Sequence, residues 1–246
     1  MLLAVSSMGL LLGSFLNVCI YRIPRGESVV FPPSHCPQCG ERLGPGELVP
    51  VFSYLWQRGR CAHCGAPIGW RYPLVELLTA LLLTLLYRRF GFSLELFYYS
   101  GLTALLIVIS FIDLDTMIIP TPLVGAGVAG AIAYNLYTGQ PLRDWLLTGV
   151  FAYGLFYLIY FISRGGMGGG DVRLAGLLGL VLGWRLLACA LLVAFVSGAL
   201  LALLLLASGR ATRKTAVPFG PFLALGYFVA LLWGHSLLNW YLGLFF

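Results

Sequence analysis

The sequence predicts an all-α polytopic membrane protein with one small extramembrane domain. Hydrophobic residues make up 60% of the chain and charged residues only 10%, whereas about 25% of the residues in soluble domains are charged. The apolar residues form runs close to the length of about 20 residues that a helix needs to cross a bilayer. A soluble core has no room for this much apolar surface, so a soluble fold is excluded. Four of the six cysteines fall in the one long polar segment, residues 22–71.

The apolar runs predict about eight membrane helices, six of them clearly marked. The first run lacks a basic leading region and an A-x-A cleavage site, so we expect a membrane span there and not a cleaved signal peptide. Residues 237–246 either extend the last run or lie in the membrane interface. The runs are 2–21, 74–87, 93–112, 118–137, 145–162, 172–184, 186–207 and 217–233.

The chain is expected to divide into three parts: a first membrane helix at 1–21, a four-cysteine cytoplasmic domain at 22–71 and a membrane domain at 72–246. Seven prolines in the middle part argue against long helices there. A segment of about 50 residues rarely folds without a metal or disulfides. The four cysteines are therefore its expected anchor.

The positions of the basic residues support this arrangement. If residues 22–71 lie in the cytoplasm and every run crosses, eleven cationic residues are cytoplasmic and four lie on the other side, as the positive-inside rule requires. The net charge of +6 thus reflects membrane topology, and no nucleic-acid partner is expected. The eleven are Arg22, Arg25, Arg42, Arg58, Arg60, Arg71, Arg164, Arg173, Arg210, Arg213 and Lys214, and the four are Arg88, Arg89, Arg143 and Arg185.

Acidic residues at two helix ends form the candidate catalytic site. A glycine-rich stretch at 165–170 precedes Asp171, and the same threading places Asp113 and Asp115 on the same side of the membrane as Asp171. Ionisable groups at membrane depth are costly and are functional candidates. Because residues two apart on a helix do not share a face, at most one of Asp113 and Asp115 meets Asp171 squarely. Two carboxylates that share one proton are suited to peptide hydrolysis.

The glycines before Asp171 are expected to shape this site. Gly168, Gly169 and Gly170 have no Cβ atoms, so a substrate strand can approach the backbone closely, and the backbone can adopt a positive φ. The alternative is that Asp171 only caps the helix that follows it.

The four cysteines of the polar segment have the spacing of a metal site. Two C-x2-C pairs are separated by 21 residues, and a glycine follows each pair. Four thiolates in this pattern suit tetrahedral, structural Zn²⁺. Two disulfides are the alternative, although a reducing cytoplasm argues against them, and His35 and His63 are alternative ligands. The expected ligands are Cys36, Cys39, Cys61 and Cys64, whereas Cys19 and Cys189 are expected to be buried free thiols without a chemical role.

Other motifs favour structural interpretations. Gly9 and Gly13 permit close helix packing, and Asn17 is expected to form a hydrogen bond between helices. The cation and acid of the stretch 71–76 suggest an ion pair or a helix cap. The stretch 218–222, Pro-Phe-Gly-Pro-Phe, either breaks a helix beside the active site or starts one.

Several of these motifs, in this order, resemble the type IV prepilin peptidases, which are bacterial inner-membrane aspartic proteases of the GxGD kind. The resemblance extends nearly end to end. It is carried by Gly-Ser-Phe-Leu-Asn-Val at 13–18, the double C-x2-C, Arg-Tyr-Pro-Leu-Val-Glu at 71–76, Asp113 seven residues before Pro120, Gly-Gly-Gly-Asp at 168–171 and Pro-Phe-Gly-Pro at 218–221.

The resemblance implies two activities. One cleaves the basic leader from prepilins or pseudopilins of type IV pili or type II secretion, on the cytoplasmic face of the inner membrane. The other methylates the new N-terminal amine with S-adenosylmethionine. The resemblance also implies that the catalytic pair is Asp113 and Asp171, and not Asp115. The chain departs from many members at Thr121-Pro122, which removes no expected catalytic residue.

The sequence contains no strand-then-glycine nucleotide fingerprint, so it identifies no residues that bind S-adenosylmethionine. Two alternatives remain at this point. One is an aspartic membrane peptidase that acts on another substrate class without methyl transfer. The other is a non-enzymatic membrane scaffold or transporter. A proton-coupled carrier is expected to have repeated halves, and the sequence has none.

Overall fold

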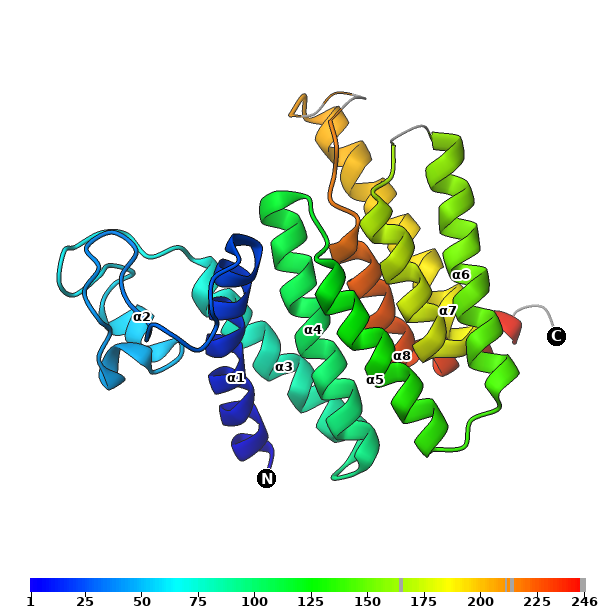
Figure 1. Ribbon diagram of the computed structural model, residues 1–246, viewed down its shortest axis with the longest axis horizontal. Coiled ribbons are helices and arrows are strands. Elements are labelled where there is room, and N and C mark those ends of the chain that lie inside the picture. The colour runs from blue at the N-terminus through cyan, green and yellow to red at the C-terminus, as the bar shows by residue number, and fades with distance from the viewer. Residues whose placement is uncertain (164–165, 211, 213–214, 244–246) are drawn as a thin grey trace. The chain divides into compact units, whose positions relative to one another are not determined.

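The computed structural model describes residues 1–163, 166–210, 212 and 215–243 (Figure 1). Within these ranges the chain forms eight α-helices, two short 3₁₀ turns and two isolated β-bridges, and no β-strand. The predicted all-α class is therefore confirmed. The predictions made for Arg164, Gly165, Arg213, Lys214 and residues 244–246 lie outside the described residues.

The chain folds as two compact units, Met1–Val108 (unit 1) and Ile109–Phe246 (unit 2). Unit 1 contains α1 (Leu2–Arg22), α2 (Phe52–Trp56) and α3 (Arg71–Phe90). Unit 2 contains α5 (Thr121–Tyr137), α6 (Leu142–Ser163), α7 (Gly169–Ala207) and α8 (Gly220–Leu242). Helix α4 (Leu94–Thr116) passes from the first unit to the second.

Helices α1 and α3 pack closely in unit 1, where small residues let their backbones approach. A Cβ atom on Gly9 would lie 2.5 Å from Cα of Ala80, and one on Gly13 would lie 2.6 Å from Cα of Glu76. The Nδ2 of Asn17 donates a hydrogen bond to the carbonyl of Tyr72, 3.1 Å away. The predicted roles of these glycines and of Asn17 are confirmed.

Helix α7 is the longest element and contains a sharp break. At about 1.5 Å per residue, its 39 residues exceed the thickness of a bilayer. Gly183 interrupts the helix with φ 66° and ψ 174°, a conformation that glycine adopts without steric cost. Figure 1 shows that both ends of α7 lie toward the same end of unit 2. The two spans predicted at 172–184 and 186–207 are thus the two limbs of α7.

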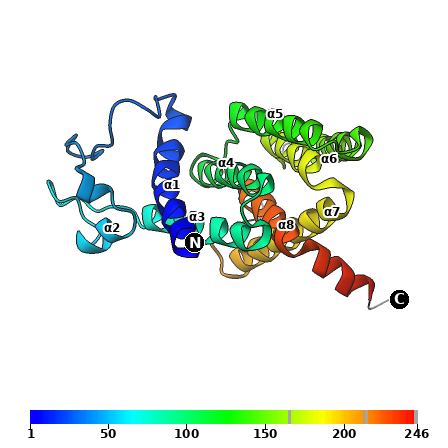
Figure 2. The ribbon, with the colours of Figure 1, turned by 90° about the horizontal axis from the view of Figure 1, so that it is seen from below.

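Helices α5 and α6 pack against the first limb of α7 (Figures 1 and 2), whereas α8 packs against the second limb, where a Cβ atom on Gly234 would lie 2.6 Å from Cδ2 of Leu186. A Cβ atom on Gly179 would lie 2.6 Å from the carbonyl oxygen of Thr148 in α6. From α5, the Nδ2 of Asn135 donates a hydrogen bond to the carbonyl of Leu180, 2.9 Å away. These contacts fix the first limb of α7, which begins two residues before Asp171.

Five helical segments among the described residues are long and apolar enough to cross a membrane. They are Leu2–Arg25, Leu94–Thr116, Leu142–Ser163, Gly169–Ala207 and Gly220–Tyr241. Large apolar side chains such as Leu3, Phe161 and Leu203 lie exposed on them, as expected for surfaces that face lipid. The protein is therefore a multi-pass membrane protein. The predicted runs in α3 and α5 fall outside this set because α3 carries four charged residues and α5 has only 17 residues.

Candidate active site and candidate metal centre

Asp113 lies near the C-terminal end of α4 and is 4% exposed. Its Oδ2 accepts a hydrogen bond from the backbone N–H of Gly220, at the start of α8, over 2.9 Å. The helix ends just beyond, where Met117 adopts a left-handed conformation and its N–H donates to the carbonyl of Asp113. Asp115 is exposed. The two acids therefore differ in environment, as their spacing predicted.

Asp171 lies in the first turn of α7 and is 7% exposed. Its Oδ2 accepts a hydrogen bond from the backbone N–H of Gly168, 3.2 Å away, in the manner of a helix cap. Its Oδ1 is buried and accepts no hydrogen bond from the described part of the chain. The capping alternative thus accounts for one oxygen of Asp171 and leaves the other available.

The side chain of Ile119 lies next to both Gly170, which precedes Asp171, and Gly220, whose N–H donates to Asp113. A Cβ atom on Gly170, next to Asp171, would lie 2.7 Å from Cβ of Ile119. A Cβ atom on Gly220 would lie 2.8 Å from Oδ2 of Asp113 and 3.4 Å from Cδ1 of Ile119. Two buried carboxylates from α4 and α7 therefore share one small region of unit 2.

The expectation of positive φ values in the glycine stretch is wrong for its described members. Gly168 has φ −77°, and neither Gly169 nor Gly170 has a positive φ. The reason is that Gly169 and Gly170 already form the first turn of α7, where φ is negative. At Gly170 the absence of a side chain makes room for Ile119, whereas Gly169 faces open space.

Sequence reasoning missed Gly220 and Ile119 as parts of this site. The Pro-Phe-Gly-Pro-Phe stretch gave a partial signal, because one predicted role was to start a helix, and α8 does begin at Gly220. The alternative, a break within a helix, is wrong, although the N–H of Gly220 does reach Asp113. Thr121 is one of two positions at which the sequence differs from many type IV prepilin peptidases. Its hydroxyl accepts a hydrogen bond from the guanidinium of Arg173. That contact ties the start of α5 to α7.

Gly220→Ala is expected to reduce proteolytic activity by about 10²-fold, because the added Cβ would displace the Asp113 carboxylate, and a misplacement of about 1 Å can cost that much. Gly125→Ala is the matched control, since a Cβ atom at Gly125 of α5 meets nothing within 4 Å. Initial cleavage rates of the two purified variants are the measurement. Equal rates would show that the Gly220 contact does not position Asp113.

The four cysteines of residues 22–71 lie on two turns of the same design. The Cys36 and Cys61 N–H groups donate to the carbonyls of Glu41 and Ala66 at 2.9 Å and 2.8 Å. The glycines that follow, Gly40 and Gly65, have φ values of 74° and 71° and close each turn. Left-handed glycines of this kind favour turns that direct backbone amides toward sulfur. The N–H groups of Cys39 and Gln38 act on the Cys36 thiol and lower its pKa to about 7.

The sulfur atoms of these turns fit one tetrahedral metal ion. The Sγ atoms of Cys36, Cys39, Cys61 and Cys64 all lie within 4.8 Å of one another, and those of Cys36 and Cys64 are 3.9 Å apart. Zn–S bonds of about 2.3 Å in a tetrahedron require sulfur–sulfur separations of about 3.8 Å.

All four thiols of the cluster are free, so the disulfide alternative is not adopted. The neighbouring histidines have other partners. The Nδ1 of His35 contacts the Pro33 carbonyl at 3.0 Å, and the Nε2 of His63 contacts Glu47 at 3.3 Å. The donor set is therefore four sulfur atoms, which suits zinc.

Comparison with known proteins assigns both regions to one family. A family model described as the bacterial peptidase A24 N-terminal domain matches residues 7–90, and one described as the type IV leader peptidase family matches residues 100–203. No solved structure matches this chain.

Curated proteins named prepilin leader peptidase/N-methyltransferase are similar over most of the sequence. The protein from Bacillus subtilis is 38% identical over 237 residues, which cover 95% of each chain. The one from Pseudomonas aeruginosa is 36% identical over 264 residues, covering 96% of this chain and 91% of the relative. The one from Myxococcus xanthus is 42% identical over 215 residues, covering 85% of this chain and 64% of the relative. The chain therefore belongs to the prepilin leader peptidase/N-methyltransferase family.

Proposed function

We propose that this protein cleaves the basic leader peptide from type IV prepilins or pseudopilins and N-methylates the new N-terminal residue. The observation that carries the proposal is the pair of buried carboxylates, Asp113 and Asp171, on either side of Ile119 in a membrane-embedded unit. The names of the relatives support both activities. The Oδ1 of Asp171 is buried and accepts no hydrogen bond from the described residues, which favours an enzyme over a scaffold, because a purely structural carboxylate has no use for an unpaired oxygen.

In the proposed peptidase, Asp113 and Asp171 act as one catalytic pair. The ionised carboxylate takes a proton from water as the water oxygen attacks the scissile carbonyl carbon. The protonated carboxyl group donates a hydrogen bond to the carbonyl oxygen, which gains negative charge. When the C–N bond breaks, the leaving nitrogen receives a proton from the pair. The N–H of Gly220 holds Asp113 in place throughout, while Gly168 does the same for Asp171.

The substrate fits this placement of the acids. A prepilin presents a basic leader, then the cleavage point, then an apolar helix. We propose that the apolar helix lies among the membrane helices while the leader stays in water. The open space beside Gly169 supports an approach of the substrate backbone at the N-terminal end of α7, with Gly168 and Gly170 completing the glycine surface.

The four-cysteine segment is proposed to hold structural Zn²⁺ on Cys36, Cys39, Cys61 and Cys64. Such a closed site crosslinks two turns and stabilises a small domain without activating water. S-adenosylmethionine is the proposed methyl donor. We assign residues 1–21 to the first membrane helix, 22–71 to a cytoplasmic domain and 72–246 to the membrane domain, all in the bacterial inner membrane.

The purified protein is expected to shorten a prepilin at one position and to add one methyl group to the product. The test incubates it in detergent or lipid with the prepilin and S-adenosylmethionine and measures the mass of the product. A reaction without S-adenosylmethionine is the control and is expected to give the cleaved, unmethylated product. An unchanged prepilin in both reactions would refute the proposed peptidase, and cleavage without methylation would refute the proposed methyltransferase.

A further inference from the structure

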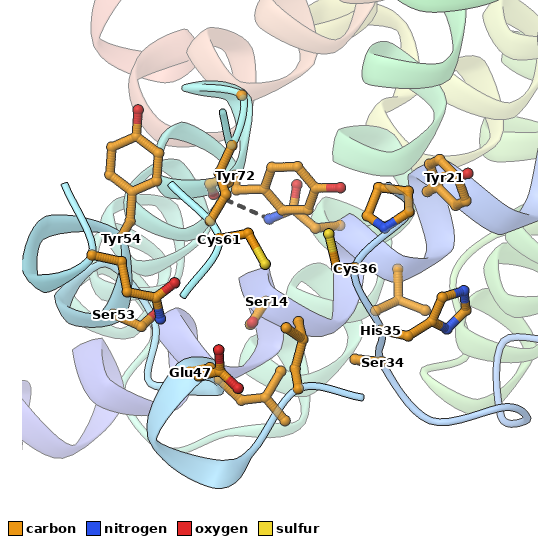
Figure 3. Close-up of a pocket in the computed structure, with 18 of the residues that line it drawn as sticks. Ser14, Tyr21, Ser34, His35, Cys36, Glu47, Ser53, Tyr54, Cys61 and Tyr72 are labelled. Atoms are coloured by element: carbon orange, nitrogen blue, oxygen red, sulfur yellow. Dashed lines mark hydrogen bonds between the residues drawn. The ribbon is translucent and has the colours of Figure 1, made fainter. Parts of the chain in front are cut away.

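Unit 1 contains a cavity that the proteolytic chemistry does not use. Its volume is about 300 Å³, at the lower end of the range of about 300–1,000 Å³ for small-molecule sites. Its walls come from the second half of α1, the start of α3 and the four-cysteine segment, residues 22–71. Figure 3 shows side chains from these elements around it, including Ser14, Cys36 and Cys61.

Two acceptor atoms in the cavity wall have no hydrogen-bond partner among the residues that the structure describes. The Oδ1 of Asn17 and the Oε1 of Glu47 are buried and accept no hydrogen bond from the described residues. Asn17 is only 2% exposed, and its Nδ2 is fixed by the carbonyl of Tyr72. Buried polar atoms in native proteins are nearly always paired. A ligand that brings hydrogen-bond donors into the cavity would satisfy both oxygens.

The charged groups around the cavity favour a cationic ligand. Glu47 lines it, with its Oε2 held by the Gly44 N–H at 2.8 Å, and this hydrogen bond lowers the pKa of Glu47. Glu76, 6% exposed, also lines it. The Oε2 of Glu76 accepts the Val51 N–H at 2.7 Å.

The one arginine among the lining residues does not cancel these two carboxylates. The guanidinium of Arg22 donates to the carbonyls of Ser28 and Pro33 at 2.9 Å and 3.5 Å. While His35, whose Nδ1 contacts the Pro33 carbonyl, is uncharged, two ionised carboxylates outnumber this arginine by one.

Aromatic rings complete the wall. Tyr21, Tyr54 and Tyr72 all line the cavity. Arginine guanidinium groups lie over the rings of Tyr21 and Tyr72, at 3.8 Å and 5.6 Å from the centroids. Tyr54 is therefore the best placed to meet a flat heterocycle or a positive charge. An anionic, aromatic cavity of this size suits an organic cation that carries a flat ring.

We propose that this cavity binds the sulfonium methyl donor, a molecule of the S-adenosyl class, and that the N-terminal amine of the cleaved pilin is methylated at its mouth. The inference rests on the proposed methyltransferase activity. A sulfonium carries positive charge beside a ring system and an amino acid group. Asn17 and Glu47 supply acceptors for its N–H donors, and the Glu47 carboxylate also supplies negative charge.

The positive charge that is present throughout methyl transfer is compatible with an anionic cavity wall. The amine enters as the free base, having lost a proton to solvent. Its nitrogen lone pair forms the new N–C bond as the C–S bond breaks, and the electron pair of that bond stays on sulfur. The positive charge thus moves from sulfur to nitrogen, and the product is a secondary ammonium ion beside a neutral thioether. The Glu47 carboxylate faces a cation before and after the step.

The position of the cavity in unit 1 suits the pilin amine that receives the methyl group. Asn17 is in the last turns of the membrane helix α1, and Glu47 belongs to the extramembrane segment. The cavity therefore lies where the membrane helices meet that segment. A cleaved pilin begins with an apolar helix, so its new amine emerges at this same depth.

The test measures methyl transfer from S-adenosylmethionine to a pre-cleaved pilin, using the full chain in detergent. Glu47→Gln keeps an oxygen for the Gly44 N–H but removes the charge, and it is expected to raise the KM for S-adenosylmethionine about tenfold or more, as loss of a charge-assisted contact does. Glu41→Gln is the matched control, because Glu41 lies in the same segment, is exposed and does not line the cavity. Leader cleavage and zinc content should be unchanged in both variants.

A second measurement locates the donor directly. Ultraviolet crosslinking of methyl-labelled S-adenosylmethionine, followed by peptide mapping, is expected to label peptides that contain Tyr54 or Tyr72. Labelling only within unit 2, or an unchanged KM in Glu47→Gln, would overturn the assignment of the cavity and leave the methyltransferase proposal standing. A wild-type protein that transfers no methyl group would instead remove the proposed activity itself.

Discussion

Asp113→Asn and Asp171→Asn are each expected to lower the rate of leader cleavage by at least about 10²–10⁴-fold, the contribution of a positioned acid or base. Asparagine preserves the size of the side chain and can still accept the N–H of Gly220 or Gly168. It cannot take a proton from water, so the pair can no longer cycle between its two states. Asp115→Asn is the matched control, since Asp115 is exposed, and it should retain much of the activity.

Initial rates with a purified prepilin test this result, and methyl transfer to a pre-cleaved pilin shows that each variant is folded. Both asparagine variants are expected to keep that second activity, because the proposed donor cavity is in unit 1 and the acids are in unit 2. Full cleavage by either variant would show that the pair is not catalytic. Loss of methylation in a folded Asp113→Asn protein would show that the two activities are not independent.

Loss of the metal is expected to have the second large effect. One zinc ion per chain should bind to Cys36, Cys39, Cys61 and Cys64, and a Cys39→Ser or Cys64→Ser variant should lose it. Binding free energy at a structural zinc site is largely folding free energy. Methylation should therefore fall at least as strongly as cleavage, because the two cysteine turns also form part of the cavity wall.

Elemental analysis, together with both activity assays, checks this expectation. Cys189→Ser is the matched control, since Cys189 is buried in α7, away from the cluster in sequence, and it should retain zinc. Metal-free wild-type protein with two disulfides in residues 22–71 would contradict the proposed site. A much larger fall in cleavage than in methylation would contradict the assignment of the cysteine segment to the methyltransferase.

Much of the fold followed from composition and local pattern. Long apolar runs predicted α1, α4 and α6 because backbone groups in lipid must be satisfied within one helix. The double C-x2-C with Gly40 and Gly65 predicted the two turns, since the geometry of each is set by residues close in sequence. The break in α7 was placed at Arg185 from the pattern, whereas the structure has it at Gly183. Glycine alone tolerates that backbone conformation, and hydropathy does not record it.

The contacts that complete the sites join residues far apart in the chain, so local sequence patterns did not predict them. The Gly220 N–H reaches Asp113 across 107 residues, and Ile119 is one apolar residue among many. The cavity in unit 1 arises only when α1, α3 and the polar segment meet, so no spacing predicted it. Glu76 had suggested an ion pair or a helix cap, but it accepts the N–H of Val51, a partner that only the tertiary fold supplies.

The division into two units has a kinetic consequence for the product. Cleavage is proposed for the acids of unit 2 and methyl transfer for unit 1, so a cleaved chain is methylated only if it reaches the unit 1 cavity before it dissociates. The fraction released without a methyl group then equals the release rate divided by the sum of the release and transfer rates. An apolar helix that leaves the bilayer slowly keeps this fraction small. Pilins with a shorter or more polar first helix should therefore accumulate more of the unmethylated form.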